Sequence, residues 1–321
     1  MSSGVNSADG TRPRTLRRLY WLMLLVTVCW SANIIAGKQA LTGFAPLALA
    51  QVRVLGTAVI YAAAFLLTPK VRDLRLSLRQ WLALIAAALS GITFNQILFI
   101  VGLGRSTVAH TGLIIALGPV MVLLLAVLLR MEKLTAWKFV GMMISFGGVG
   151  VLTADKAGAG GGTHWVGDLT LLAGTAVFAI YTILMKDLAH RYDALTLNAL
   201  VFTLGAVFLL PFGARQVLRT PWASLGFDAW WGCGFMVLLG TVVPYVLFAW
   251  VLRGLTASRV AAFSYLQPVI ASGLAVWVLS EPLTVKVVAG GALILGGVYL
   301  TERGEDSPAY GRGDISDVAA G

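Results

Sequence analysis

Residues 117–135 read LGPVMVLLLAVLLRMEKLT, and residues 266–284 read LQPVIASGLAVWVLSEPLT. The two stretches are 149 residues apart, and at this offset 14 of the 43 positions from 107 to 149 are identical. The shared residues include a proline, a glutamate and a threonine, which a merely apolar composition would not align. The sequence therefore predicts that the chain contains two copies of one unit.

Apolar stretches of membrane-spanning length recur along the chain, which is 58% hydrophobic and only 12% charged. Soluble domains carry about 25% charged residues, and about 20 apolar residues are needed to cross a bilayer. A backbone in lipid must hydrogen-bond within itself, so these spans should be helices. We expect an all-α integral membrane protein with ten transmembrane helices, at about 19–39, 46–68, 81–103, 107–129, 135–153, 166–186, 195–213, 230–252, 256–280 and 283–301.

Each copy of the repeat contains five of these spans. An odd number of crossings turns the second copy upside down relative to the first, giving two inverted five-helix repeats. This is an architecture of secondary transporters, which bind substrate near the bilayer midplane between the repeats. The expected parts are a cytoplasmic tail at 1–16, a first repeat at 17–153, a Gly-rich linker at 154–164, a second repeat at 165–303 and a disordered cytoplasmic tail at 304–321.

The distribution of basic residues predicts the orientation. With the N-terminus inside, 17 Lys and Arg residues lie at cytoplasmic ends and 6 at outer ends, apart from Arg53 within a span. An excess of Lys and Arg marks the cytoplasmic side. We expect a multi-pass protein of a bacterial inner membrane with both termini in the cytoplasm. The first apolar stretch is long and is not followed by a small-residue cleavage site, so it should be retained as a helix.

Several functional classes lack their sequence signals. The net charge of +10 is spread between the spans rather than gathered on one face, which argues against a nucleic-acid partner. Cys29 and Cys233 have no neighbouring ligand residues, and the chain has no G-x-x-x-x-G-K-[ST] loop. We therefore expect no metal, no cofactor and no catalytic residues. A membrane-embedded enzyme and a signalling scaffold without transport are the alternatives, but neither a catalytic set nor a soluble output domain is visible.

A set of residues along the spans matches the pattern of a known family. They are Trp30, Asn33, Lys38, Arg53, Gln96-x-Leu98-Phe99, Ala109-His110-Thr111, Pro119, Glu132 with Leu134-Thr135, and Gly147-Gly148-Val149. Over 17–303 the chain resembles the drug/metabolite transporter superfamily, specifically its ten-helix exporters with two EamA domains. The resemblance implies a secondary transporter that exports a small amino-acid-like or aromatic metabolite or drug by alternating access. It indicates neither the individual substrate nor the coupling ion.

Polar and aromatic residues within the spans are candidate substrate contacts, because polar groups in lipid are costly and usually face a cavity or a partner. Asn33 lies one turn from Trp30, and Tyr181 occupies the matching position of the second copy. Interhelical packing is the alternative role at each position. The predicted substrate-binding residues are Trp30, Asn33, Asn95, Gln96, Tyr181, Tyr245, Tyr265 and Gln267, and the predicted helix kinks are at Pro119, Pro244 and Pro268.

Four basic residues are candidates for a charge or gating role. Arg53 lies well inside the second span, where it could face an anionic group of a substrate, a helix end or a lipid phosphate. His110, just inside the fourth span, could relay protons or simply pack. Lys38 and Lys186 lie at matched positions near helix ends, where long side chains reach toward the interface.

The acidic residues are expected in tails, turns and helix ends. Glu132 and Glu281 precede the fifth and tenth spans and should stabilise the N-termini of those helices. Small residues in Gly141-x-x-x-Ser145 and Ala292-x-x-x-Gly296 permit close helix packing within the chain. The expected partners are a small-molecule substrate and the lipid bilayer, with a monomer that forms at most weak dimers.

Overall fold

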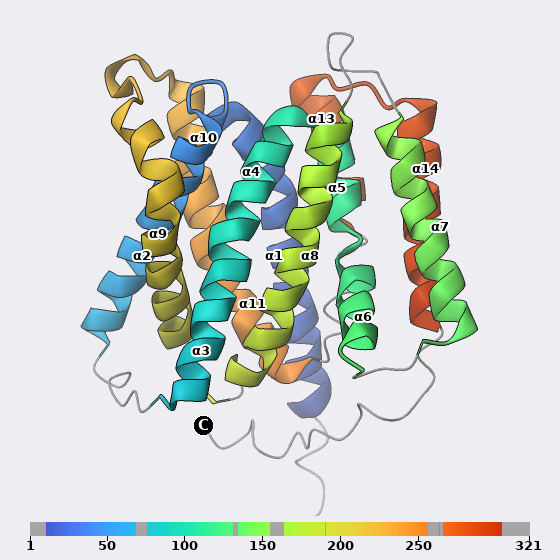
Figure 1. The fold of residues 1–321 in the computed structure, drawn as a ribbon, viewed down its shortest axis with the longest axis horizontal. Coiled ribbons are helices and arrows are strands. Elements are labelled where there is room, and N and C mark those ends of the chain that lie inside the picture. Colours follow the sequence, from blue (N-terminus) through green and yellow to red (C-terminus); the bar gives the residue numbers. More distant parts are fainter. Residues whose placement is uncertain are drawn as a thin grey trace, which may run out of the picture.

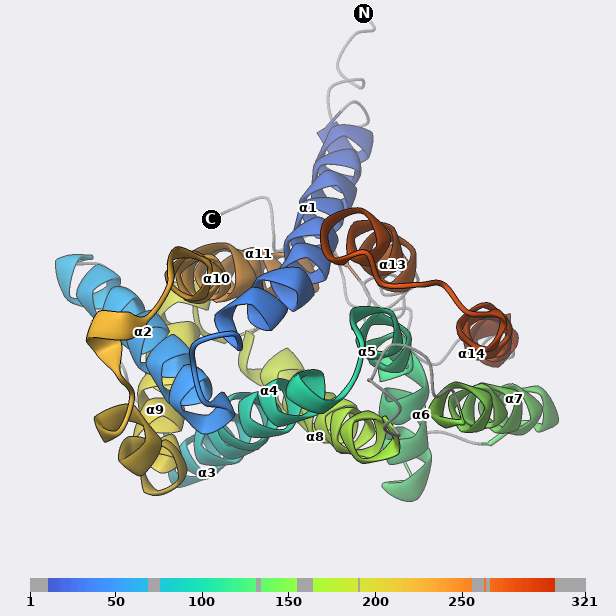
Figure 2. The same ribbon diagram turned by 90° about the horizontal axis from the view of Figure 1, so that it is seen from above.

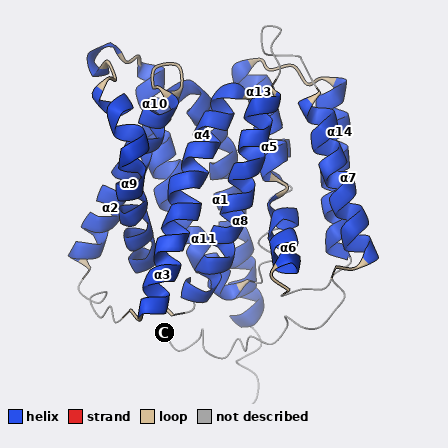
Figure 3. Ribbon diagram, viewed as in Figure 1, coloured by secondary structure: helices blue, strands red, loops and turns tan. Residues whose placement is uncertain are grey.

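The computed structural model describes residues 11–68, 76–130, 134–154, 164–189, 191–255, 263 and 266–303. Every regular element in these ranges is helical (Figure 3). Within them, seven helices are long and apolar enough to cross a membrane, and three shorter apolar helices cover Ala136–Leu152, Leu266–Leu279 and Val285–Thr301. The chain therefore folds as a polytopic helical membrane protein.

The helices form one bundle whose elements run up and down in turn (Figure 1). In chain order they are α1 (Thr11–Ala40), α2 (Pro46–Leu67), α3 (Leu78–Ala87), η2 (Ala88–Phe94), α4 (Asn95–Arg105), α5 (Val108–Ile115), α6 (Gly118–Leu128), α7 (Ala136–Thr153), α8 (Trp165–Ala189), α9 (Ala194–Leu218), η3 (Trp222–Ser224), α10 (Phe227–Val237), η4 (Leu238–Val242), α11 (Val243–Gly254), α13 (Leu266–Leu279) and α14 (Val285–Arg303).

Hydroxyl and carboxylate caps mark where several helices begin. Thr135 and Thr284, which lie at matched positions of the two copies, accept the backbone N–H groups three residues later, at the starts of α7 and α14. Thr107 and Asp193 cap α5 and α9 in the same way. Such caps satisfy one of the N–H groups that a helix leaves free at its start. The repeated Leu-Thr pair is thus a helix start signal in both copies.

The expected third and eighth spans each contain a π-helical turn. The third runs through α3, η2 and α4, and the eighth through α10, η4 and α11. Thr93 and Thr241 donate their hydroxyls to carbonyls five residues earlier, at 3.2 and 2.7 Å. A π turn widens the helix and exposes backbone groups, and it often lies at a functional site. These two turns contain the matched glycines Gly91 and Gly240.

The expected fourth span is broken rather than continuous. α5 ends at Ile115 and α6 begins at Gly118, with Pro119 in its first turn. Proline has no N–H to donate and restricts the residue before it, so a helix does not pass through this point undisturbed. Pro244 and Pro268 likewise lie in the first turns of α11 and α13.

Seen from above, α7 and α14 form a pair at one edge, while α1, α4, α5, α8, α11 and α13 lie toward the middle (Figure 2). The edge pair is closely packed: a Cβ atom on Gly141 would lie 2.6 Å from the Gly297 carbonyl oxygen, and one on Gly148 would lie 2.7 Å from that of Gly290. Small residues let helix backbones approach in this way. Gly141 of the predicted Gly141-x-x-x-Ser145 motif thus packs within the chain, whereas Gly296 of Ala292-x-x-x-Gly296 has no atom near its Cβ position and does not pack against α7.

Candidate functional site

Four aromatic side chains contact one another in the middle of the bundle. They are Trp30 of α1, Phe178 and Tyr181 of α8, and Tyr245 of α11, here called the aromatic cluster. Around it the ring centroids are 6.5 Å (Trp30–Phe178), 5.2 Å (Phe178–Tyr181), 6.2 Å (Tyr181–Tyr245) and 6.0 Å (Tyr245–Trp30) apart. The cluster joins residues of both repeats that the sequence had indicated only separately.

The depth of the aromatic cluster follows from helix geometry. The apolar span of α1 runs from Arg17 to Ala40. At about 1.5 Å per residue, Trp30 lies about 20 Å from the start of this span and about 15 Å from its end. The cluster is therefore near the middle of the apolar thickness.

Asn33, beside the aromatic cluster, and Tyr181, within it, occupy matched positions of the two copies. Each packs against a π turn of the other repeat. A Cβ atom on Gly240 would lie 2.0 Å from Asn33 Oδ1, and one on Gly91 would lie 2.1 Å from Tyr181 Cδ2. Any side chain at either glycine would displace its neighbour. The residues matched in sequence thus make matched contacts in space.

Polar atoms next to the aromatic cluster are left without partners. Asn33, Gln96 and Arg53 are only 5%, 3% and 3% exposed. Among the described residues, Asn33 Oδ1, Gln96 Oε1 and Arg53 Nη1 have no hydrogen-bond partner. A buried polar group left unpaired costs about 1–3 kcal/mol. Two free acceptors and one free donor are thus buried beside the aromatic cluster, where a ligand with complementary groups would satisfy them.

Arg53 reaches from α2 to the π turn η4. Its Nε donates to Thr241 Oγ1 at 2.9 Å and its Nη2 to the Gly240 carbonyl at 3.3 Å. The guanidinium carbon lies 5.8 Å from the centre of the Phe99 ring, and Tyr245 interacts with both Arg53 and Gln96. Arg53 therefore fixes η4 with two nitrogens and leaves the third beside the aromatic cluster.

The remaining predicted substrate residues differ in their placement. Asn95 Nδ2 donates to the Gly174 carbonyl of α8 at 3.0 Å, which is the interhelical role. Gln267 is 4% exposed, and its backbone carbonyl accepts a hydrogen bond from Ser31 Oγ of α1 at 3.5 Å. Tyr265 and the side chain of Lys186 lie outside the described residues.

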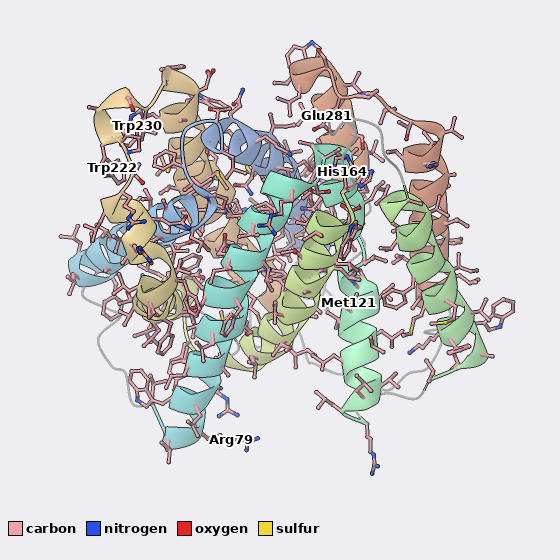
Figure 4. All side chains as sticks on the ribbon, turned by 45° about the horizontal axis from the view of Figure 1, so that its top comes forward. Arg79, Met121, His164, Trp222, Trp230 and Glu281 are labelled. Atoms are coloured by element: carbon pink, nitrogen blue, oxygen red, sulfur yellow. The ribbon has the colours of Figure 1, made fainter. Side chains whose placement is uncertain are left out.

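A second polar group, here called the distal cluster, lies at the end of the bundle away from Arg79. It consists of Lys38, Ser106, His110, His164, Asp168 and Glu281. Figure 4 shows His164 and Glu281 at this end and Arg79 at the other. The cluster draws residues from both repeats, and its polar groups hydrogen-bond one another.

The centre of the distal cluster is a buried histidine–aspartate pair. His110 Nδ1 lies 2.9 Å from Asp168 Oδ2, and the two side chains are 1% and 0% exposed. Ser106 Oγ donates to the other Asp168 oxygen, and Lys38 Nζ donates to the Ser106 carbonyl. The rings of His110 and His164 are 5.3 Å apart. Among the described residues no three His, Cys, Asp or Glu side chains are grouped as a metal site would need.

Glu281 stabilises a different helix from the one we expected. Its carboxylate accepts from the backbone N–H groups of Val108 (3.0 Å) and Ala109 (3.5 Å) at the start of α5, not α14. The end of α13 directs it there, because Ser280 is left-handed (φ 54°) and the Glu281 N–H bonds the Ala275 carbonyl at 3.2 Å. A left-handed residue is a common end of a helix. The matching Glu132 lies outside the described residues.

Two cavities are found at the distal end. One of about 270 Å³ is lined by Lys38, Gly104, Arg105, Ser106, Thr107, His164 and Glu281, and one of about 420 Å³ by Pro46, Leu47, Val101, Gly104, Arg105 and Gln216. No residue of the aromatic cluster lines either cavity, because the rings of the cluster pack against one another. Polar residues of the distal cluster line the smaller cavity, which connects the cluster to the end of the bundle.

Sequence reasoning singled out His110 and Lys38 but missed Ser106, His164 and Asp168. The signal available was weak: an Asp four residues after a His, at the start of an apolar span. We expected such an acid only as a helix-end residue. Asp168 does lie in the first turn of α8, but it is fully buried.

The apolar helices and their buried polar centre define a polytopic membrane protein, and comparison identifies its family. The EamA-like transporter family matches residues 17–154 and again 165–303. The chain belongs to this family, and it is a transporter rather than an enzyme.

Named relatives are similar over nearly their whole length. The uncharacterized transporter YvbV of Bacillus subtilis is 30% identical, covering 90% of this chain and 92% of that one. An uncharacterized transporter of Archaeoglobus fulgidus is 28% identical, covering 88% and 98%. A probable terminal-alkyne amino-acid exporter of Streptantibioticus cattleyicolor is 29% identical, covering 90% and 94%.

A solved crystal structure, described only as that of a protein, has the same fold. It aligns with a TM-score of 0.62 at 18% identity, covering 90% of this chain and 99% of that one.

Proposed function

We propose that this chain is a secondary exporter that moves a small amino-acid-like or aromatic metabolite by alternating access. It consists of ten transmembrane helices in two inverted five-helix repeats, in a bacterial inner membrane with both termini in the cytoplasm. It works as a monomer, and its substrate site is the aromatic cluster with Asn33, Gln96, Arg53 and Gln267.

The packing of the two repeats supports this architecture. Asn33 packs on Gly240 and Tyr181 on Gly91, and each of these contacts becomes the other when the copies are exchanged. The seven long apolar helices and the three shorter ones together supply the ten crossings. Two halves with interchangeable contacts can exchange inward-open and outward-open shapes, as alternating access requires.

The observation that carries the function is the set of unpaired polar atoms beside the aromatic cluster. An amino acid presents a carboxylate, an ammonium group and a side chain. Arg53 Nη1 offers a donor for the carboxylate, and Asn33 Oδ1 and Gln96 Oε1 offer acceptors for the ammonium group. The aromatic rings provide an apolar wall and a surface that attracts a cation. The name of the Streptantibioticus relative points to the same class of substrate.

Transport by the purified chain tests this proposal. Proteoliposomes loaded with unlabelled L-phenylalanine should accumulate external radiolabelled L-phenylalanine by exchange, while protein-free liposomes should not. L-Leucine and L-threonine serve as further probes of the same class. A properly folded protein that exchanges none of the three contradicts the assignment to amino-acid-like substrates.

Reporter fusions test the orientation independently. A reporter that is active only in the cytoplasm should work when fused after Gly4 and when fused after Tyr310. Activity of a periplasmic reporter at either position contradicts the orientation but leaves the substrate site untouched.

A further inference from the structure

We propose that His110 and Asp168 form a proton-binding site that controls the opening of the distal end of the transporter. The inference rests on the proposed function for its purpose, because a transporter has to open this end in order to exchange substrate there. The observation that carries it is a fully buried histidine–aspartate pair joining the two repeats.

The pair has the geometry of a site that holds one exchangeable proton. An ionised carboxylate only accepts hydrogen bonds, so neutral His110 donates its Nδ1 hydrogen to Asp168 Oδ2 at 2.9 Å. Ser106 Oγ donates to Asp168 Oδ1, which leaves both carboxylate oxygens satisfied. An incoming proton would bind at His110 Nε2, and the pair would change from a net charge of −1 to 0. Histidine is the side chain whose charge ordinarily changes between pH 5 and 8.

The pair lies between the two repeats. His110 and Ser106 belong to the first repeat, at the start of α5 and the end of α4, whereas Asp168 belongs to α8 of the second. The helices approach closely here: a Cβ atom on Gly167 would lie 2.6 Å from the Arg105 carbonyl oxygen. The pair can therefore reach solvent only if the distal ends of α4, α5 and α8 separate.

The charged groups around the pair determine how its protonation changes the net charge of the closed distal end. Lys38 of α1 contributes one positive charge, and Asp168 of α8 and Glu281 after α13 contribute two negative charges, whereas Arg105 of α4 is exposed to solvent. With both histidines neutral, Lys38, Asp168 and Glu281 carry a net charge of −1. Lys286 of α14 is exposed and donates to the Ala154 carbonyl instead. One added proton on the pair removes this net charge from the closed end.

An uncompensated buried charge is costly, so protonation of the pair should favour the closed distal end, and loss of the proton should favour the open one. His164 and the cavity of about 270 Å³ lie next to the pair on the solvent side. Loss of the proton would thus open the end from which an exporter releases its cargo. The proton is the ligand of this site, and the substrate binds elsewhere, at the aromatic cluster.

Cysteine labelling can test the inference without any transport substrate. The full-length chain carries Cys29→Ala and Cys233→Ala, and Leu171→Cys is the reporter, because Leu171 is 2% exposed and lies one turn from Asp168. A chain with Ser224→Cys, at the exposed end of the short helix η3, gives the reference rate. Both proteins, in lipid nanodiscs, react with a charged maleimide between pH 8 and pH 5. The ratio of the two rates removes the pH dependence of the thiol itself.

We expect this ratio to fall about fivefold or more as the pH falls from 8 to 5, the size of an ordinary coupling between two sites. His110→Gln and Asp168→Asn keep hydrogen-bonding groups at both positions but remove the titrating pair, and each should make the ratio independent of pH. His164→Gln should keep the dependence. If Asp168→Asn does not fold, His110→Gln decides alone.

Three results would overturn the inference: a ratio that is flat in the parent, a pH dependence that persists in His110→Gln, or one abolished by His164→Gln alone. Exchange of L-phenylalanine at constant pH is a separate measurement. A flat ratio in a protein that still exchanges L-phenylalanine removes the proton site but leaves the proposed function in place.

Discussion

The aromatic cluster and the distal cluster are both buried, both polar and both shared between the repeats, yet they differ in how their polar groups are satisfied. Beside the aromatic cluster, Asn33, Gln96 and Arg53 each keep one atom without a partner. In the distal cluster, both oxygens of Asp168 and both oxygens of Glu281 accept hydrogen bonds. A satisfied network stabilises one arrangement, whereas unpaired groups lower stability and favour a ligand. This difference is why we propose the first region as the substrate site and the second as part of the contact that keeps the distal end closed.

The largest effect is expected from breaking the satisfied network. Asp168→Leu leaves His110 and Ser106 without their partner in a dry interior and should destabilise the protein by about 3–5 kcal/mol. The measurement is the thermal unfolding midpoint in detergent, followed by size-exclusion chromatography after heating. A midpoint equal to that of the parent would mean that the distal cluster does not stabilise the closed state.

At the aromatic cluster, loss of a polar atom should affect transport rather than stability. Gln96→Leu keeps the side-chain size but removes the unpaired carbonyl oxygen. If that oxygen binds substrate, the affinity should fall about 5- to 30-fold, equivalent to one hydrogen bond of about 1–2 kcal/mol. The measurement is concentration-dependent exchange of L-phenylalanine in proteoliposomes. Asn33→Ala, Tyr245→Ala and Gln267→Ala should act in the same direction, and unchanged affinity in all four would place the substrate elsewhere.

The neighbour of Gln96 offers a matched control. Asn95→Leu removes the hydrogen bond to the Gly174 carbonyl and should cost about 1 kcal/mol of stability without changing substrate affinity. The same unfolding and exchange measurements apply to both variants. An affinity loss for Asn95→Leu as large as that for Gln96→Leu would erase the distinction between the two adjacent residues.

The smallest effect is expected at the turn that directs Glu281. Ser280 has a left-handed backbone (φ 54°) and an exposed side chain, so glycine fits the position better. Ser280→Gly should raise the thermal midpoint slightly, by an amount corresponding to about 0.5–1 kcal/mol. A lowered midpoint would show that the serine side chain, not the backbone conformation, matters there.

Much of the architecture could be predicted from the sequence, because membrane spans are long and apolar. The repeat also helps, because each helix is predicted twice, once in each copy. The break between α5 and α6 was indicated only as a kink at Pro119. The π turns η2 and η4 were not predicted, since no residue type marks such a turn. Their matched glycines are visible in the sequence, but the reason for them, contact with Asn33 and Tyr181, is a property of the fold.

The two regions also differ in how much of them the sequence indicated. Trp30, Tyr181 and Tyr245 could be named in advance, because the repeat aligns positions of equal depth. His110 and Asp168 are 58 residues apart, and Glu281 is 173 residues from Val108. The repeat does not align His110 with Asp168 or Glu281 with Val108. Such contacts depend on how the helix ends meet, which no local pattern encodes.

The pairing of α7 with α14 bears on how such a chain could have arisen. Gly141 meets Gly297 and Gly148 meets Gly290, so each contact turns into the other when the repeats are exchanged. Interfaces between two identical subunits related by a twofold axis have this property. A single-repeat ancestor that inserted in both orientations would have formed the interface before a gene fusion joined the copies. The link between them then only raises their local concentration. We expect fragments 1–158 and 159–321, produced separately in one cell, to associate and form the complete helical bundle.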